Sequence, residues 1–320
     1  MASHHYLVCG WHVLSDFAVP ALMRWEGEDG PPDVTIREGR AACDDQDATW
    51  VSSRAFVTPQ GVYRLDVAGV AAFLLTGGRE IVVAPAPGHD VADLHVYLLG
   101  TVLAVLCHQR GVFPLHASCV RFAGGAHAFA GVSGAGKSTL AAALERRGSP
   151  ILSDDICAID VSGPIPQVLP SIPRVKLWPD ALPIAGFAFS PPDPSRQAKH
   201  QFSFAAHRSF DPAPVPLERI HLLETGAPRQ AASISPVHDL HTVVSSLLAH
   251  VPRIRVAHAL GLRRRLFEAA LRIAAAVPVT RLVRCAEPGR IGETLRLLPS
   301  HSAASSGQAS GSQHRDEHTV

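Results

Sequence analysis

Short runs of apolar residues, separated by Gly, Pro and Asp, follow one another through the first part of the chain. Their length, their turn-forming boundaries and their content of Val, Ile, Tyr and Phe are typical of β-strands. They predict a small β-rich N-terminal region over 1–88, in which we find no cluster of catalytic side chains. The runs lie at 6–14, 33–39, 49–58, 61–78 and 79–88.

The pattern changes to that of a helix after residue 88. Asp90 is a favourable N-cap for a helix over 91–109, which contains the most apolar run of the chain, 94–107. These fourteen residues are too few to span a bilayer. We therefore expect a buried helix and no membrane partner.

The next segment alternates strand-like and helix-like runs, which is typical of an α/β domain. Two strand-like runs, "LHASCVRF" and "AHAFA", flank a turn at 123–125 and predict a hairpin. A helix over 137–147 should end at Gly148, and 150–161 should form two short strands around an acidic pair. Further elements are expected as a loop at 170–204 with a short helix at 179–184, a strand at 217–224, helices at 235–250 and 258–277, a strand at 278–285 and a helix at 290–298.

These elements predict one α/β domain with a mixed sheet over 89–299, behind the β-rich region. The residues after 299 are small and polar and predict a disordered tail over 300–320.

Composition adds few restrictions. The chain has 320 residues, of which 47% are hydrophobic and 18% charged, and a formal net charge of +1. This balance is typical of globular proteins and gives no electrostatic reason to expect nucleic acid. The start of the chain lacks a secretory signal, so we expect a cytoplasmic protein. The six cysteines lack metal-binding spacing and are interpreted as buried free thiols in a reducing compartment.

A specific chemical signal lies at 131–138, where "GVSGAGKS" fits the Walker A pattern G-x-x-x-x-G-K-[ST]. Glycines let backbone N–H groups surround a polyphosphate, and the following helix directs its positive end at the same anion. A simple glycine turn explains neither the lysine nor the hydroxyl, and a dinucleotide loop needs a different glycine order. The predicted nucleotide-binding residues are Gly131, Ser133, Gly134, Ala135, Gly136, Lys137, Ser138 and Thr139.

Two adjacent carboxylates, Asp154 and Asp155, follow the next predicted strand. Near a triphosphate, one carboxylate can hold Mg²⁺ and the other can take the proton of an attacking hydroxyl. We assign Asp154 as the base and Asp155, with Ser138, as the metal ligands, although their order is open and a solvated turn is the alternative. His116 can lie near this pair, or it can be structural, as a lone histidine often is.

The segment 114–159 resembles the catalytic domain of HPr kinase/phosphorylase. The resemblance rests on His116 before the hairpin, the glycine loop, Arg147-Gly148 and the Asp154-Asp155 pair. It implies a serine kinase that uses ATP and Mg²⁺, in which the aspartate pair supplies the base and helps to hold the metal. The family is often oligomeric, which implies a possible homo-oligomer.

The chain departs from that family in its N-terminal region and after the aspartate pair, where the glycine-rich, glutamate-containing segment is missing. We therefore do not carry over the phosphorylase activity or HPr as substrate. The layout is more similar to stand-alone HPr-kinase-like proteins of lasso-peptide pathways, which phosphorylate a C-terminal serine of the precursor peptide. That likeness includes "RVKLWPDA", where Arg174 and Lys176 can bind the transferring phosphoryl group or a peptide carboxylate and Trp178 can form an apolar wall. Lys199 and His200 lie in a second basic stretch that can close over the site.

The sequence thus predicts an ATP-dependent serine kinase acting on a peptide or small protein, with Asp154, Asp155, His116, Lys137 and Arg174 as its catalytic residues. A kinase of a small-molecule hydroxyl and a non-catalytic nucleotide-binding regulator are the alternatives. The donor is also open among ATP, GTP and pyrophosphate.

Overall fold

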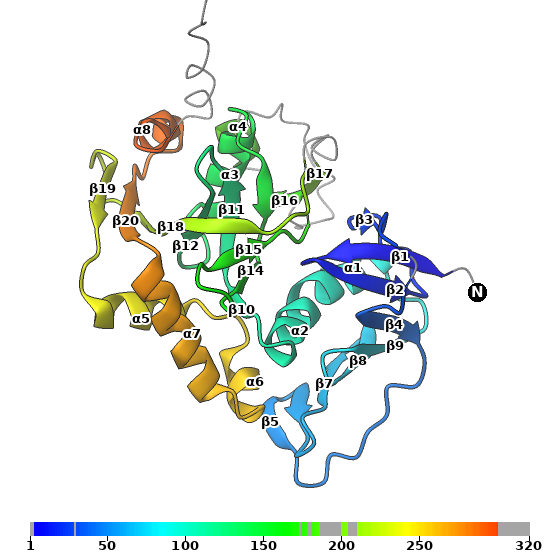
Figure 1. Ribbon diagram of the computed structural model, residues 1–320. Helices are drawn as coiled ribbons and strands as arrows, with labels where there is room; N and C mark the ends of the chain where they lie inside the picture. Colours follow the sequence, from blue (N-terminus) through cyan, green and yellow to red (C-terminus); the bar gives the residue numbers. More distant parts are fainter. Residues whose placement is uncertain are drawn as a thin grey trace, which may run out of the picture.

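A computed structural model describes residues 3–28, 30–172, 174–177, 181–185, 200–203 and 210–299. Two large sheets dominate the described residues, and both mix parallel with antiparallel pairing (Figure 1). Helices lie against both sheets, so the predicted α/β class is confirmed. A small two-stranded sheet accompanies them.

The N-terminal sheet contains the strands predicted from the short apolar runs. Its order is β3-β1-β2-β4-β9-β8-β7-β6-β5, with the β2–β4 and β4–β9 pairs parallel. Alternating burial along β7 and β8 places one side-chain row in the core, as strand periodicity requires. The strands are β1 His4–Val8, β2 Trp11–Ser15, β3 Met23–Arg24, β4 Val34–Glu38, β5 Thr49–Ser52, β6 Ala55–Val57, β7 Tyr63–Val67, β8 Ala71–Thr76 and β9 Glu80–Pro85.

The predicted helix over 91–109 is present and has three parts, α1 Val91–Tyr97, a π-helical turn Leu98–Val102 and α2 Leu103–Gln109. The Asp90 carboxylate accepts a hydrogen bond from the backbone N–H of Ala92 (2.8 Å), as expected of an N-cap. By length and composition this helical segment could cross a membrane, and 61% of its most apolar window is buried inside the protein.

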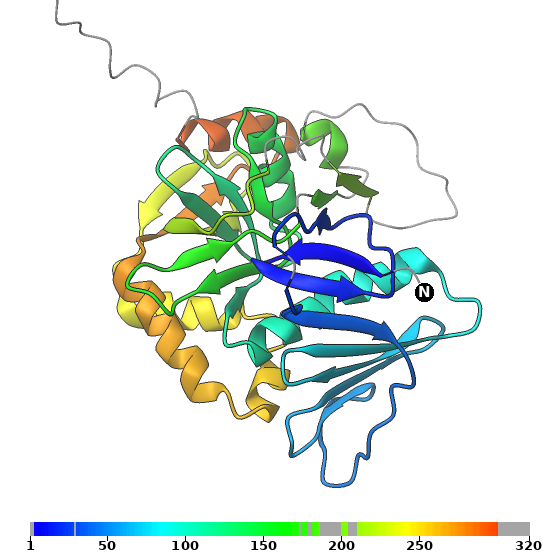
Figure 2. The same ribbon diagram turned by 45° about the vertical axis from the view of Figure 1, so that its right-hand side comes forward.

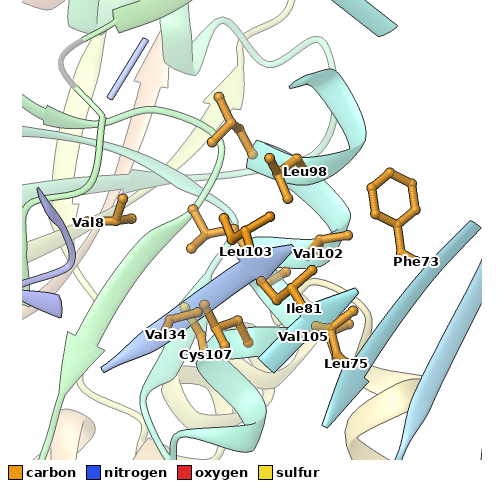
Figure 3. Close-up of a cluster of buried hydrophobic side chains, with 14 of the residues drawn as sticks. Val8, Val34, Phe73, Leu75, Ile81, Leu98, Val102, Leu103, Val105 and Cys107 are labelled. Atoms are coloured by element: carbon orange, nitrogen blue, oxygen red, sulfur yellow. The ribbon is translucent and has the colours of Figure 1, made fainter. Parts of the chain in front are cut away.

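This helical segment packs against the N-terminal sheet. Figure 3 draws Leu98, Val102 and Val105 beside Phe73 and Ile81, and all five belong to one buried hydrophobic cluster. The sequence pattern grouped the segment with the α/β region after residue 88. Its packing instead makes it part of the N-terminal core.

The second sheet has the order β10-β14-β15-β18-β12-β11-β13, and β20 extends it beside β18. The long strand β18 pairs with β12 on one edge; on its other edge lie β15 and then β20. Helices α5 and α7 lie on one face and α3 lies on the other (Figures 1 and 2). The buried side chains of α5 and α7 belong to one hydrophobic cluster of this sheet and those of α3 to another. The strands are β10 Phe113–Leu115, β11 Ala117–Arg121, β12 Ala126–Ala130, β13 Ile151–Ser153, β14 Cys157–Asp160, β15 Gln167–Leu169, β18 Val215–Thr225, β19 Ser233–Pro236 and β20 Val279–Arg284; the helices are α3 Lys137–Glu145, α5 Leu240–Ala249, α6 Ile254–Ala259, α7 Arg263–Ala276 and α8 Ile291–Arg296.

Three predicted boundaries differ from the structure. Part of the segment expected as a loop is a strand, β16 Arg174–Leu177, which pairs with β17 His200–Ser203. The helix expected from residue 235 begins at Leu240, because the preceding residues form β19 against β20. The helix expected over 258–277 is divided into α6 and α7 at Gly261, whose φ is 75°. A short helix, α4 Ala181–Ile184, fits the prediction, but its expected start at 179 lies outside the described residues, as does the tail 300–320.

The two large sheets share buried side chains. The N-terminal cluster includes Ile156, Ala158 and Ile172, which come from the second sheet and its connections. The backbone N–H of Cys9 also donates to the carbonyl of Pro170 (3.0 Å). All six cysteines are free and five are buried, which fits the interpretation as thiols.

Candidate active site

The glycine loop lies between the end of β12 and the start of α3, as predicted. Gly134 and Gly136 have φ angles of 83° and 94°, a region that side chains with a Cβ rarely adopt. Gly136 is the N-cap of α3 and provides no capping side chain. The first N–H groups of a helix have no partner within the helix, so this end of α3 is suited to bind an anion.

Gly131 is needed for a different reason. A Cβ at this position would lie 2.6 Å from the backbone oxygen of Leu223 on β18. No rotamer change relieves a clash with backbone. The first glycine of the motif therefore lets the loop leave β12 close against the neighbouring strand.

Lys137 is buried at the start of α3, with 7% of its surface exposed. Its ammonium donates to the carbonyl oxygens of Gly131 (2.8 Å) and Val132 (3.2 Å). The side chain thus folds back over the loop. This position is compatible with the predicted role of an ammonium that holds phosphate oxygens.

Asp154 lies in the turn after β13 and is held by three hydrogen bonds. One carboxylate oxygen accepts from the hydroxyls of Ser118 (2.5 Å) and Ser138 (2.9 Å), and the other from the backbone N–H of Lys176 (3.0 Å). Burial raises the pKa of Asp154 and the charge of Asp155 adds to the rise, while the hydrogen bonds oppose it. A carboxyl group in a cleft whose pKa is shifted by burial and by a neighbouring charge is a candidate functional residue.

Asp155 has a φ of 76°, a strained conformation for a residue other than glycine. The Nδ1 atom of His116 lies 3.0 Å from its backbone oxygen and 3.2 Å from its carboxylate. Since a carbonyl only accepts, Nδ1 carries the proton in that hydrogen bond. His116 therefore lies beside the acidic pair, as predicted.

Arg174 lies near the same pair but is 5% exposed, and no part of it lines the cavity described below. Burial lowers the pKa of Arg174, and the charges of Asp154 and Asp155 counteract this. Its position suits the balancing of carboxylate charge. Lys176, two residues along β16, does line the cavity. Trp178 and Lys199 lie outside the described residues, as does the His200 side chain.

A cavity of about 480 Å³ joins these groups, a volume within the ordinary range for small-ligand sites. The predicted residues that line it come from the loop, the start of α3, the acidic pair and His116; Gly131 and Ala135 support the loop from outside the lining. One wall was not predicted, because no motif marks it. It consists of Arg284, Cys285, Ala286, Glu287, Ile291 and Thr294, from the end of β20 and the start of α8.

The oxygen atoms at the loop fit Mg²⁺. Among the described residues there is no group of three His, Cys, Asp or Glu side chains that could hold a metal ion. Mg²⁺, however, is commonly held by one or two carboxylates together with substrate phosphates. The sequence analysis paired Ser138 with Asp155 as ligands. In the structure the Ser138 hydroxyl donates a hydrogen bond to Asp154 (2.9 Å), and Asp155 lines the same cavity.

The site thus combines a helix end suited to an anion, a lysine, a hydroxyl–carboxylate pair suited to a hard cation, and a second carboxylate beside a histidine. Such a set can bind a polyphosphate and remove a proton from a nearby hydroxyl. Comparison with protein-family models and with curated proteins gave no match to this chain. Functional inference therefore rests on the site and on the sequence motifs.

Proposed function

We propose that this protein is an ATP- and Mg²⁺-dependent kinase that phosphorylates a serine of a peptide or small protein. The observation that carries the proposal is the convergence of Lys137, Ser138 and the Asp154–Asp155 pair on one cavity. The resemblance of 114–159 to HPr kinase catalytic domains supports the same chemistry. The proposal includes a cytoplasmic location and a possible homo-oligomer.

In this proposal the loop N–H groups and the Lys137 ammonium bind the β- and γ-phosphates of the donor. Ser138 and Asp154 are the residues that would hold the metal. Bound Mg²⁺ supplies positive charge that offsets the charge developing on the transferred group. Lys137 is buried, and an ammonium in such surroundings interacts more strongly with phosphate oxygens than it would in water.

We assign the base role to Asp155 and the metal role to Asp154, the reverse of the order taken from sequence. Asp154 uses both oxygens in hydrogen bonds, one of them to the loop hydroxyl. Asp155 is 41% exposed at the side chain, lines the cavity and contacts His116. It would accept the acceptor's hydroxyl proton while the new O–P bond forms and the bond to the leaving ADP breaks.

The acceptor class follows from the resemblance and from Lys176. Stand-alone HPr-kinase-like proteins of lasso-peptide pathways phosphorylate a C-terminal serine. Lys176 lines the cavity, its backbone N–H donates to Asp154, and an ammonium at this position would suit the α-carboxylate of such a residue. A precursor peptide ending in serine is therefore the acceptor that we would test first.

The experiment is incubation with Mg·ATP and a pool of peptides that end in serine, followed by mass spectrometry for added phosphate. Matched peptides ending in alanine, and small polyols, run beside it. We expect phosphate on the serine peptides, and none with Lys137→Ala. Phosphate on the polyols would favour a small-molecule kinase. Nucleotide binding without any transfer would favour a regulator.

A further inference from the structure

The helical segment over 91–109 extends from the N-terminal core to the candidate active site. Its apolar side chains pack in the cluster of the N-terminal sheet (Figure 3). Its middle, the π-helical turn Leu98–Val102, also lies against the acidic pair, because a Cβ added at Gly100 would lie 4.0 Å from Oδ2 of Asp155. An element of the N-terminal core therefore borders the carboxylate that we assign as the base.

The two oxygens of the Asp155 carboxylate face different neighbours. Oδ1 lies 3.2 Å from Nδ1 of His116, and Oδ2 is the oxygen that faces Gly100. The Asp155 side chain is 41% exposed, so a hydroxyl from outside can reach it. A base must lie within hydrogen-bond distance of the proton that it takes. A hydroxyl that gives its proton to Oδ2 therefore lies beside Gly100.

Gly100 leaves space at this position. Apart from the helix itself, the described residues place only the Asp155 oxygen within 4 Å of the added Cβ, and the glycine is half-buried. Neither packing nor backbone conformation requires a glycine, since 4.0 Å is an ordinary van der Waals contact and its φ is not positive. Glycine inside a helix is also less favourable than alanine. The space beside Asp155 is thus the reason that we find for this glycine.

The turn that contains Gly100 is held from two sides. The guanidinium of Arg253, the N-cap residue of α6, donates to the Thr101 hydroxyl (2.5 Å). Burial lowers the pKa of His95 on α1, and the charge of Arg174 adds to this, which indicates that α1 lies close to β16. π-helical turns are rare and are frequent at functional sites. The segment is therefore fixed beside the acidic pair before an acceptor binds.

We propose that the N-terminal core completes the acceptor site, and that Gly100 leaves the space in which a serine hydroxyl meets Oδ2 of Asp155. The inference rests on the proposed function, because it takes Asp155 to be the base. It also gives the β-rich N-terminal region a function, since this region holds the helical segment that forms one wall of the acceptor site. Gly100 is then a residue that determines specificity, because it sets the size of the group that reaches the base.

The test is single-turnover phosphate transfer from Mg·ATP to a peptide that ends in serine, with wild type and two variants of the full chain. Gly100→Ala adds a methyl group in contact with Oδ2 of Asp155, and Gly100→Leu fills the space. We expect the rate to fall about tenfold in the alanine variant and about 100-fold or more in the leucine variant. Calorimetric affinity for the Mg²⁺ complex of a non-hydrolysable ATP analogue should change by less than about twofold.

Two controls separate a blocked acceptor site from a damaged fold. Ala275→Leu adds similar bulk at an exposed position of α7 and should keep the wild-type rate and affinity. Gly100→Ala should unfold at no lower temperature than wild type, because alanine favours a helix. Slower transfer by a protein that is at least as stable as wild type is a result that a purely structural role of Gly100 does not give.

The outcomes distinguish this inference from the proposed function. If wild type transfers phosphate and both Gly100 variants keep its rate, the inference is overturned while the kinase proposal stands. The inference is also overturned if Gly100→Ala loses stability and nucleotide affinity together with its rate. If wild type transfers no phosphate, both proposals fall. The alanine variant keeps the test valid if the leucine variant does not fold.

Discussion

At Asp154 the requirements of folding and of the proposed function conflict, because the function uses an ionised carboxylate where burial disfavours the charge. Three hydrogen bonds fix its position, yet burial raises its pKa, so its ionised form is less favourable in the folded chain than in water. Groups with this property cluster at functional sites. In the proposed function, the positive charge of bound Mg²⁺ would offset this unfavourable ionisation.

Because ionised Asp154 is unfavourable in the folded chain, we predict that Asp154→Asn stabilises the metal-free protein at neutral pH. The folded pKa is raised, so the ionised group destabilises the fold as pH rises from the ordinary aspartate pKa through the folded one. An asparagine can still accept from Lys176 and donate to the two serines. We expect a gain on the order of 1 kcal/mol at pH 7 in EDTA, shrinking towards pH 4, by thermal unfolding.

Asp45→Asn is the matched control, because Asp45 is exposed and far from the loop in sequence. It should change stability by less than about 0.5 kcal/mol at either pH. An Asp154→Asn protein that is less stable than wild type at pH 7, or whose gain is independent of pH, would contradict this view of the carboxylate.

At the scale of elements, the site depends on how closely β12 and β18 bring the loop to its neighbour. The φ angle of Gly131 lies outside the positive range that favours glycine, but a side chain there would meet the backbone of Leu223. The glycine is thus required by the parallel strand beside it. Gly134 and Gly136 are required by their own φ angles.

Because the loop lies so close to β18 at Gly131, we predict that Gly131→Ala destabilises the folded protein. The added methyl group must displace β18 or the loop, since the opposing atom is 2.6 Å away and belongs to the backbone. We expect about 1–3 kcal/mol of destabilisation in urea unfolding, a typical overpacking cost. Gly163→Ala is the control, because nothing lies within 4 Å of its added methyl group, and it should be close to neutral. Equal effects in the two variants would rule out the close approach as the reason for Gly131.

The strand–loop–helix unit and the hairpin before it could be predicted because each is encoded locally. β12 is a short apolar run, the loop is a motif, and α3 has helix-forming residues ended by Gly148. The strand β16 was not predicted, because its proline-rich surroundings are typical of a loop and because its partner β17 lies far along the chain. The cavity wall that runs from Arg284 to Thr294 has no local signal in the sequence, since only the sheet order brings it to the loop.

At the scale of the whole molecule, the two sheets are joined by a shared core. Ile156, Ala158 and Ile172 pack in the cluster of the N-terminal sheet, and the helical segment 91–109 packs there as well. Periodicity indicated that this segment is a buried helix. It contained no information on which sheet would cover it, because an apolar face fits either one.

The shared core predicts one cooperative unfolding transition for the described body of the protein. Separating the sheets would expose buried side chains from both, so neither should persist without the other. In a Trp178→Phe variant, tryptophan fluorescence comes from Trp11, Trp25 and Trp50, all in the N-terminal sheet region. Urea unfolding of this variant followed by circular dichroism and by fluorescence should give coincident curves. Two separate transitions would mean that the regions are independent domains.

The most direct measurement of the central claim is a single-turnover rate of phosphate transfer from Mg·ATP to a serine peptide, compared between wild type and Asp155→Asn. We predict transfer by wild type and a rate lower by about 100-fold or more in the variant, with nucleotide affinity retained, because the general base is lost. A variant as fast as wild type, or no transfer to a hydroxyl by wild type, would contradict the account.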